Sequence, residues 1–235
     1  MNSRKILLLA SMLVLSVAAN AKEEGWSGKV NLGYLATSGN TENSSLNSAF
    51  GLEYDSEKWE HLFQMAAIRA SENDETTAQA FEASWKSEYS VADDNYVFGR
   101  VKWSKDKFSG YDQQVSETVG YGRRILDTDV HQLSAELGIG AAQSDLRDGT
   151  SEDDFIGRAA ANYKWVLNST AEFQQDLSVE SGADNTYMES VSAIKTTLIG
   201  SLSLVASYTI KSNSQVPAGT AKTDTFTALS LEYRF

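Results

Sequence analysis

The chain has 235 residues, with 20 Lys+Arg and 32 Asp+Glu, and a formal net charge of −12. This acidity excludes nucleic acid as an expected partner, because phosphate binding depends on Lys and Arg. Cysteine is absent, which excludes disulfides, thiol nucleophiles, thiolate metal sites and a lipid anchor on cysteine. After residue 21 no apolar run approaches the roughly 18 residues that a spanning helix needs, so an inner-membrane helical protein is excluded.

The first 21 residues have the parts of a secretory signal peptide. A basic pair at positions 4–5 precedes an apolar run over residues 6–18, and small residues lie before the expected cut between Ala21 and Lys22. Removing this segment takes away two basic residues and no acids, so the mature chain has 18 Lys+Arg against 32 Asp+Glu, a net charge of −14. We expect export and a single mature domain over residues 22–235.

Beyond the signal peptide, short segments alternate between apolar and polar residues, which indicates half-buried β-strands. The last seven residues show the pattern clearly, and the chain ends on an aromatic side chain. The parity of Tyr187–Leu198 is ambiguous. The pattern predicts about twelve strands: Trp26–Ala36, Leu46–Tyr54, Trp59–Arg69, Phe81–Tyr89, Tyr96–Lys105, Gln114–Ile125, His131–Ala141, Phe155–Leu167, Thr170–Glu180, Tyr187–Leu198, Leu202–Ile210 and Leu229–Phe235.

Amphipathic strands in an exported chain predict an all-β protein, a single transmembrane antiparallel up-and-down barrel in the bacterial outer membrane. The sheet has to close, because an open edge in lipid leaves backbone groups unpaired. An even strand number places both termini on the periplasmic side, and the odd-numbered connections are then external. These connections are the longer set on average, as the topology requires: Thr37–Ser44, Ser71–Thr76, Asp106–Asp112, Ser144–Asp154, Ser181–Thr186 and Lys211–Asp224.

The opening strand and first loop carry the most specific signal. Residues 26–34 read Trp-Ser-Gly-Lys-Val-Asn-Leu-Gly-Tyr, and residues 37–41 read Thr-Ser-Gly-Asn-Thr. With the length, the short loops and the terminal Tyr-Arg-Phe, they resemble the salt-induced outer-membrane proteins, the YdiY-like group, a domain of unknown function. The resemblance covers the mature chain and implies an outer-membrane barrel of unassigned activity, linked to salt or osmotic stress. Taken alone, Gly39-Asn40 is a good turn pair, which favours hairpin closure over a ligand-binding loop.

Two histidines bear on the alternative function, a membrane-embedded lipid-modifying enzyme. A Ser/His phospholipase needs a histidine, a nearby serine and an orienting polar group. His131 begins a strand at a periplasmic turn. His61 shares the parity of the lipid-facing Trp59, with no Ser or Asn on that face of the same strand. We interpret both as interfacial histidines and predict no catalytic residue, no cofactor and no metal site.

Acidic residues gather in two of the predicted external loops, at residues 72–75 and 145–154. Carboxylates grouped in this way could hold Ca²⁺ or Mg²⁺, but the regular ligand spacing of a calcium loop is missing. We interpret them as solvated loop faces. The alternative hypothesis is that they share divalent ions with lipopolysaccharide phosphates.

Some charged residues occupy the strand positions whose side chains should point into the barrel, and they carry most of the functional information. Both signs occur in similar numbers, so these residues either pair and fill the lumen or line a narrow water-filled pore. About eight strands enclose a filled interior and about sixteen to eighteen leave an open channel, so twelve allow both. We predict a narrow passive channel or an envelope-structural barrel. The predicted lumen-lining residues are Lys29, Glu82, Lys86, Arg100, Lys102, Glu136, Arg158, Lys164, Glu172 and Asp176.

The C-terminal strand has a second predicted role. Its outward residues Leu229, Leu231, Tyr233 and Phe235 resemble the terminal signal that the outer-membrane assembly machinery recognises. We expect that machinery, together with outer-membrane lipid and lipopolysaccharide, as partners. The sequence indicates no oligomeric state.

Overall fold

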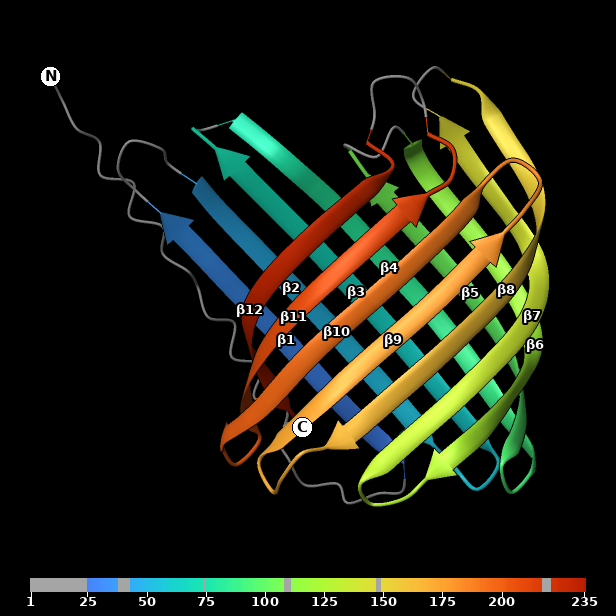
Figure 1. Cartoon of the computed structure of the whole chain (residues 1–235), viewed down its shortest axis with the longest axis vertical. Helices are drawn as coiled ribbons and strands as arrows, with labels where there is room; N and C mark the ends of the chain where they lie inside the picture. The colour runs from blue at the N-terminus through green and yellow to red at the C-terminus, as the bar shows by residue number, and fades with distance from the viewer. Residues whose placement is uncertain (1–24, 38–42, 74, 108–110, 147–148, 217–220) are drawn as a thin grey trace, which may run out of the picture.

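Twelve antiparallel strands close into one barrel in the computed structural model (Figure 1). The structure describes residues 25–37, 43–73, 75–107, 111–146, 149–216 and 221–235. The predicted signal peptide and the Gly39-Asn40 turn therefore lie outside the described residues. Each strand pairs with its neighbours in the chain, and β1 pairs with β12 to complete the ring. No helix in the described ranges has the length and hydropathy of a membrane span.

The predicted count of twelve strands and the up-and-down order are confirmed. The strands are β1 Trp26–Thr37, β2 Asn43–Asp55, β3 Trp59–Glu72, β4 Glu75–Ala92, β5 Asn95–Asp106, β6 Tyr111–Asp127, β7 His131–Leu146, β8 Ser151–Val166, β9 Ala171–Ser181, β10 Thr186–Ile199, β11 Leu202–Asn213 and β12 Thr223–Arg234.

Both termini of the strand set lie at one end of the barrel, the lower end in Figure 1. We call it the terminal end, and the opposite end, which the sequence predicts to be external, the distal end. Several strands reach further toward the distal end than their alternation indicated: β4 begins at Glu75 rather than Phe81, and β7 continues to Leu146 rather than Ala141. Ladder hydrogen bonds hold these extensions, and a strand beyond the lipid needs no apolar face.

The two predicted acidic loops are therefore wrong in their extent. Glu72 and Glu75 are paired strand residues flanking a short turn. Asp145 also belongs to a ladder, where its Cα partner is Ser151. Its carboxylate accepts hydrogen bonds from Gln113 Nε2 and Ser151 Oγ, each at 2.7 Å. Residues 74 and 148 lie outside the described ranges.

The outer surface of the barrel is apolar. Leu137 and Phe155, for example, are 70% and 69% exposed. Aromatic rings cluster at the terminal end, where Trp59 stacks on His61 with ring centroids 5.5 Å apart and lies 4.9 Å from the ring of Tyr89. An apolar band bordered by such rings is the exterior of a transmembrane barrel.

The ladder that closes the ring is short. β1 and β12 are in register only from Lys29–Arg234 to Leu32–Leu231, with Gly28 and Phe235 exchanging two backbone hydrogen bonds of 2.8 and 2.9 Å. The Phe235 ring covers Gly28, where any Cβ would overlap it. A Cβ at Gly33 would overlap the carbonyl oxygen of Leu229 and the side chain of Asn47. Two glycines of the opening motif thus let the two ends of the sheet meet.

Candidate functional site: the lumen

Ion pairs cross the lumen between strands that are not neighbours. Arg100 on β5 lies 3.0 Å from Glu180 on β9, and Lys211 on β11 lies 2.9 Å from Glu82 on β4. The order of strands around the ring places β5 and β9 four positions apart. These side chains therefore reach across the interior and narrow it.

One carboxylate, Glu136, is the centre of the most buried cluster. Its side chain is fully buried and accepts bonds from Lys86, from Arg158 at 2.7 Å and from the Tyr96 hydroxyl at 2.9 Å. The guanidinium of Arg158 also lies 5.6 Å from the centre of the Phe98 ring. A buried ion pair is tolerated when further hydrogen bonds satisfy its atoms, and Glu136 meets that condition.

A second cluster alternates positive and negative groups nearer the distal end. Lys102 lies 3.1 Å from Glu82 and 2.7 Å from Glu189, and Lys211 lies 2.9 Å and 3.5 Å from the same two carboxylates. The Tyr187 hydroxyl donates to Glu189 at 3.1 Å. Each cation is shared by two anions, so the cluster forms a closed network rather than separate pairs.

A third cluster lies beside the closing ladder at the terminal end. Lys195 pairs with Glu172 and lies 3.5 Å from Glu232. Arg234 contacts the same two carboxylates, at 2.9 Å from Glu232 and 3.5 Å from Glu172. This cluster ties β9 and β10 to β12 from inside the barrel.

A cavity of about 440 Å³ remains in the lumen beside these clusters. Its lining reaches from Asp106 and Asp224, at the distal ends of β5 and β12, to Glu232 near the terminal end. Ten carboxylates and four lysines line it, an excess of six formal negative charges. The cavity thus runs along most of the barrel and is acidic.

The lumen has two unlike halves. In the packed half, the inner wall of β4–β8, large side chains such as Tyr96, Phe98 and Arg158 are buried. In the open half, the inner wall of β1–β3 and β10–β12, several cavity-lining side chains are small: Ala49, Ala66, Ala193, Ser207, Ala228 and Ser230. These small side chains leave space for the cavity, which small residues of the packed half, such as Ala80 and Ser104, also line.

The structure places nine of the ten predicted lumen residues at the cavity wall, in ion pairs, or in both. Lys29, Glu82, Lys102 and Asp176 line the cavity. The lumenal ion pairs include Lys86, Arg100, Glu136, Arg158 and Glu172, together with Glu82 and Lys102. Lys164 shares the parity of Arg158 on β8, and its side chain makes no ion pair or hydrogen bond with the residues that the structure describes.

Several charged members of the clusters were not predicted. Lys195 and Glu189 lie on β10, whose parity was ambiguous, and Lys211 had been assigned to a loop rather than to β11. Glu180 ended a predicted strand without being assigned to the lumen. The alternation of the neighbouring strands, extended to β10, would have assigned Lys195 and Glu189 to the lumen.

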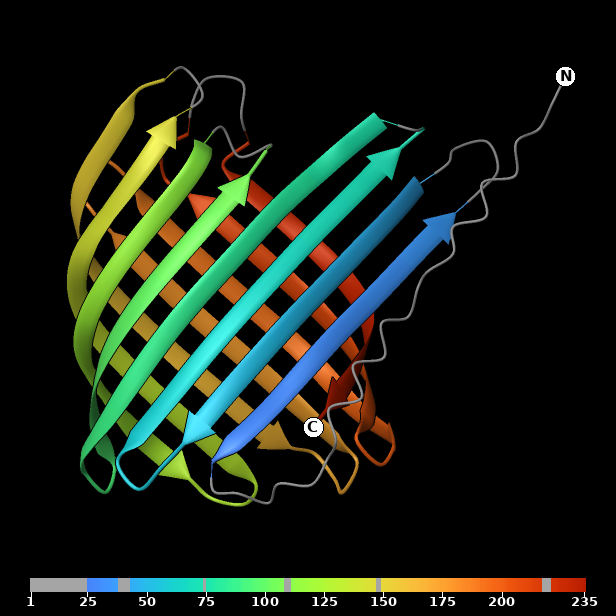
Figure 2. The same ribbon diagram turned by 180° about the vertical axis from the view of Figure 1, so that it is seen from behind.

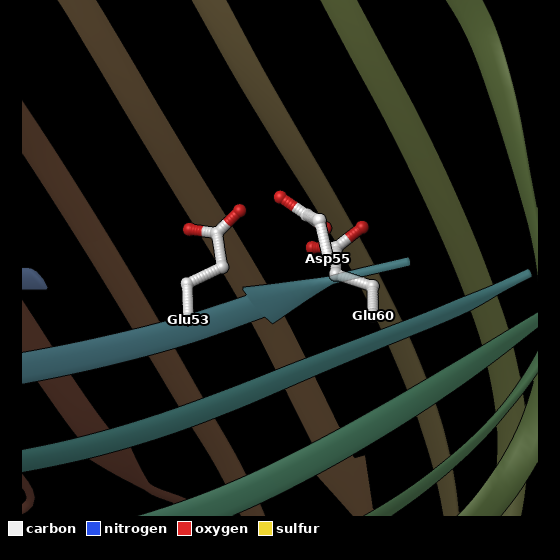
Figure 3. Close-up of side chains that lie close together, drawn as sticks. All are labelled: Glu53, Asp55 and Glu60. Atoms are coloured by element: carbon white, nitrogen blue, oxygen red, sulfur yellow. The ribbon is translucent and has the colours of Figure 1, made fainter. Parts of the chain in front are cut away.

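Three carboxylates meet at the terminal mouth. Figure 3 shows Glu53 and Asp55 rising from the end of β2 with Glu60 of β3 beside them, and one oxygen from each lies within 4.8 Å of the others. Arg124 lies 3.4 Å from Glu60 and supplies a counter-charge. Parity places Glu53 inward, but the sequence does not predict that it meets Asp55 and Glu60. The group makes the terminal mouth acidic as well.

His61 has a serine partner that the sequence analysis missed. Its Nδ1 lies 2.8 Å from Ser87 Oγ on the adjacent β4, and Ser87 Oγ also accepts a bond from Trp85 Nε1 at 3.0 Å. The sequence of β3 alone does not reveal this partner, because Ser87 belongs to the next strand. His131 repeats the arrangement with the Tyr163 hydroxyl at 2.9 Å. This repetition in the aromatic belt favours an interfacial role for both histidines.

Comparison with known proteins places this barrel in a family. Residues 30–235 match the family described as "Protein of unknown function, DUF481". The chain is 34% identical over 221 residues to "Uncharacterized protein YdiY" of Escherichia coli (strain K12), covering 94% of this chain and 87% of that protein.

Among solved structures, the COG4313 outer membrane channel from Pseudomonas putida F1 has a TM-score of 0.53 at 11% identity, covering 92% of this chain and 97% of that chain. The NanC porin has a TM-score of 0.49 at 11% identity, with 88% and 97% covered. The likeness to the channel from Pseudomonas putida shows the fold alone. The match to the family model, with the 34% identity to a full-length relative, shows that the chain belongs to the DUF481 family.

Proposed function

We propose that this protein is an outer-membrane barrel with a narrow, cation-preferring passive passage. The observation that carries the proposal is the acidic cavity whose lining reaches from Asp106 and Asp224 to Glu232. Carboxylates around a confined path raise the local concentration of cations and repel anions. The clusters that cross the lumen limit the passage to small solutes. A role in salt or osmotic stress, which the family resemblance implies, belongs to the same proposal.

Planar-bilayer recording of the purified, refolded protein tests this function. We expect small defined conductance steps and a reversal potential that indicates cation preference in asymmetric salt. Asp176 is exposed to the cavity, so Asp176→Lys should shift the reversal potential toward anions, most strongly at low ionic strength. Asp129→Lys, in an exposed turn outside the cavity and the carboxylate group of the terminal mouth, is the matched control and should leave the reversal potential unchanged.

An envelope-structural barrel is the second candidate, favoured by the ion pairs that cross the lumen. A well-folded preparation without conductance steps would support it and exclude the channel.

Localisation is part of the proposal. We expect a mature N-terminus at Lys22 after export through the periplasm, assembly by the outer-membrane machinery and contact with outer-membrane lipid and lipopolysaccharide. The folded protein should be recovered in the outer-membrane fraction and should migrate differently from the boiled protein on a denaturing gel. Recovery in the soluble periplasmic fraction would contradict the assignment.

A further inference from the structure

One lysine of the cavity wall is left without an ion pair. Four lysines line the cavity. Lys102 and Lys211 belong to the alternating cluster, and Lys105 lies 3.1 Å from Asp112. The fourth, Lys29, is half-buried, and its side chain makes no ion pair or hydrogen bond with any residue that the structure describes. Its ammonium group can therefore act on mobile ions in the cavity.

A glycine makes room for the stem of Lys29. On the neighbouring strand β2, Gly51 is the register partner of Lys29. A Cβ at Gly51 would lie 3.0 Å from Lys29 Cε and 3.1 Å from its Cγ, closer than carbon atoms of side chains normally approach. The lysine stem thus lies across β2, in the space that a larger residue at position 51 would fill.

Carboxylates from three strands attract Lys29 without forming an ion pair with it. They are Asp176 on β9, Glu232 on β12 and Glu53 on β2. The strand β9 faces the viewer in Figure 1 and β1 faces the viewer in Figure 2, so Asp176 and Lys29 lie on opposite walls. Asp176 and Glu232 line the cavity, whereas Glu53 belongs to the carboxylate group of the terminal mouth. Lys29 therefore lies between the cavity and that mouth.

A fixed positive charge at this place acts differently on monovalent and divalent cations. Carboxylate oxygens are the preferred ligands of Ca²⁺, so an acidic passage without lysine would hold divalent ions. An ammonium group repels a divalent cation twice as strongly as a monovalent cation at the same distance. A divalent ion that bridges Asp176 and Glu232 would also have to displace the ammonium group of Lys29. Charged side chains that line a pore set its ion selectivity in this way.

We infer that Lys29 excludes divalent cations from the lumen and so makes the passage selective for small monovalent cations. Its ammonium group is a tethered counter-ion of Asp176, Glu232 and Glu53. The flexible stem of a lysine lets the charged group make way for a monovalent ion. The inference rests on the proposed cation passage and names the class of ion that it conducts.

Reversal potentials of the purified full-length protein, with K⁺ on one side of a planar bilayer and Ca²⁺ on the other, test the inference. We expect the native chain to favour K⁺. Lys29→Met should lower the ratio of K⁺ to Ca²⁺ permeability by at least about fivefold, whereas Lys29→Arg keeps the charge and should keep the ratio. Lys164→Met, at an inward lysine outside the cavity lining, is the matched control. Equal permeability of the native chain to both ions, or an unchanged ratio in Lys29→Met, would overturn the inference.

A second variant moves the lysine without changing any charge. Gly51→Ala places a methyl group against the Lys29 stem and lifts it into the cavity, so the K⁺ conductance should fall. Gly99→Ala, where an added Cβ meets nothing within 4 Å, is the matched control and should conduct as the native chain does. Equal conductance of the two glycine variants would show that the Lys29 stem lies outside the ion path, and would overturn the inference.

Binding of Mn²⁺, followed by electron paramagnetic resonance of the refolded protein in detergent, separates this inference from the proposed function. Lys29→Met should bind Mn²⁺ at least about fivefold more tightly than the native chain, and adding Asp176→Asn should remove the gain. Equal affinity of Lys29→Met and the native chain would overturn the role of Lys29 even in a protein that conducts. A gain in affinity without any native conductance would contradict the passage and support Lys29 as the group that excludes divalent ions.

Discussion

The packed and open halves of the lumen solve the same geometric problem differently. Twelve strands enclose more space than one layer of side chains can fill. In the packed half, Glu136 gathers Lys86 and Arg158 around a buried carboxylate against the Tyr96 ring. In the open half, residues such as Ala66 and Ala193 leave the volume to the cavity. One wall of the barrel is thus packed around buried ion pairs, while the opposite wall leaves room for the cavity.

The largest expected effect comes from reversing two charges in the packed half. Arg100→Glu with Arg158→Glu would place new carboxylates beside Glu136 and Glu180, where Arg100 and Arg158 now pair with them. Removing one partner of a buried pair costs about 3–5 kcal/mol, and a double reversal should cost more. We expect a large fall in the thermal unfolding midpoint.

The same double variant distinguishes the two views of the lumen. If a passage exists, the fraction that still folds should become more selective for cations at low salt. If the lumen is filled, the protein should lose stability and show no defined conductance. Normal stability together with unaltered selectivity would contradict both views and the assigned parity. Lys58→Glu, in an exposed turn, is the control.

Removing the central carboxylate should have the next largest effect. Glu136→Ala leaves Lys86 and Arg158 without their shared partner, at a cost of about 3–5 kcal/mol in the free energy of unfolding. Denaturant unfolding in detergent measures it. Glu57→Ala in an exposed turn should change it by less than about 0.5 kcal/mol. A loss equally small at Glu136 would mean that the packed half does not hold the barrel together.

Enlarging side chains in the open half should change conductance more than stability. Ala66→Leu with Ala193→Leu adds bulk to the cavity wall, where space is free, so the unfolding midpoint should stay near that of the native chain. Single-channel conductance should fall by more than about half, because ion flow near the cavity scales with its open area. Ala159→Leu, exposed on the lipid-facing side of β8, is the matched control. Unchanged conductance would place the ion path outside the cavity.

Deletion of Phe235 should lower assembly while leaving secretion intact. Its backbone makes two hydrogen bonds with Gly28, and its ring covers that glycine. Loss of the two bonds costs about 1–3 kcal/mol at the shortest ladder of the barrel. Immunoblots of membrane and periplasmic fractions measure the effect, and Phe235→Ala isolates the contribution of the ring. Unchanged outer-membrane levels of the deletion would refute an assembly role for Phe235.

The smallest effect is expected among the aromatic side chains at the terminal end, where His61 and His131 make similar hydrogen bonds. Ser87→Ala removes the partner of His61, and Tyr163→Phe removes that of His131. Each substitution should lower the free energy of unfolding by about 1 kcal/mol or less, and thermal unfolding measures the change. Phospholipid hydrolysis by the native chain that disappears in Ser87→Ala would instead establish the lipid-modifying enzyme.

Alternation along the chain was sufficient for the strands, their number and the apolar exterior, because side chains of a strand point to opposite faces with a period of two. It assigned Leu137 to the lipid and Glu136 to the lumen without any knowledge of neighbours. It failed where the polar pattern continued beyond the membrane, as in the distal extension of β4, and where parity was ambiguous, as for Lys195.

Only the tertiary structure decided which inward residues meet. The pairing of Arg100 with Glu180 depends on the ring closing so that β5 faces β9, and that of His61 with Ser87 depends on the register of β3 against β4. The cavity and the short β1–β12 ladder depend on side-chain volumes and strand curvature summed around the whole ring. Such quantities involve residues far apart in the chain, and a local period of two carries no information about them.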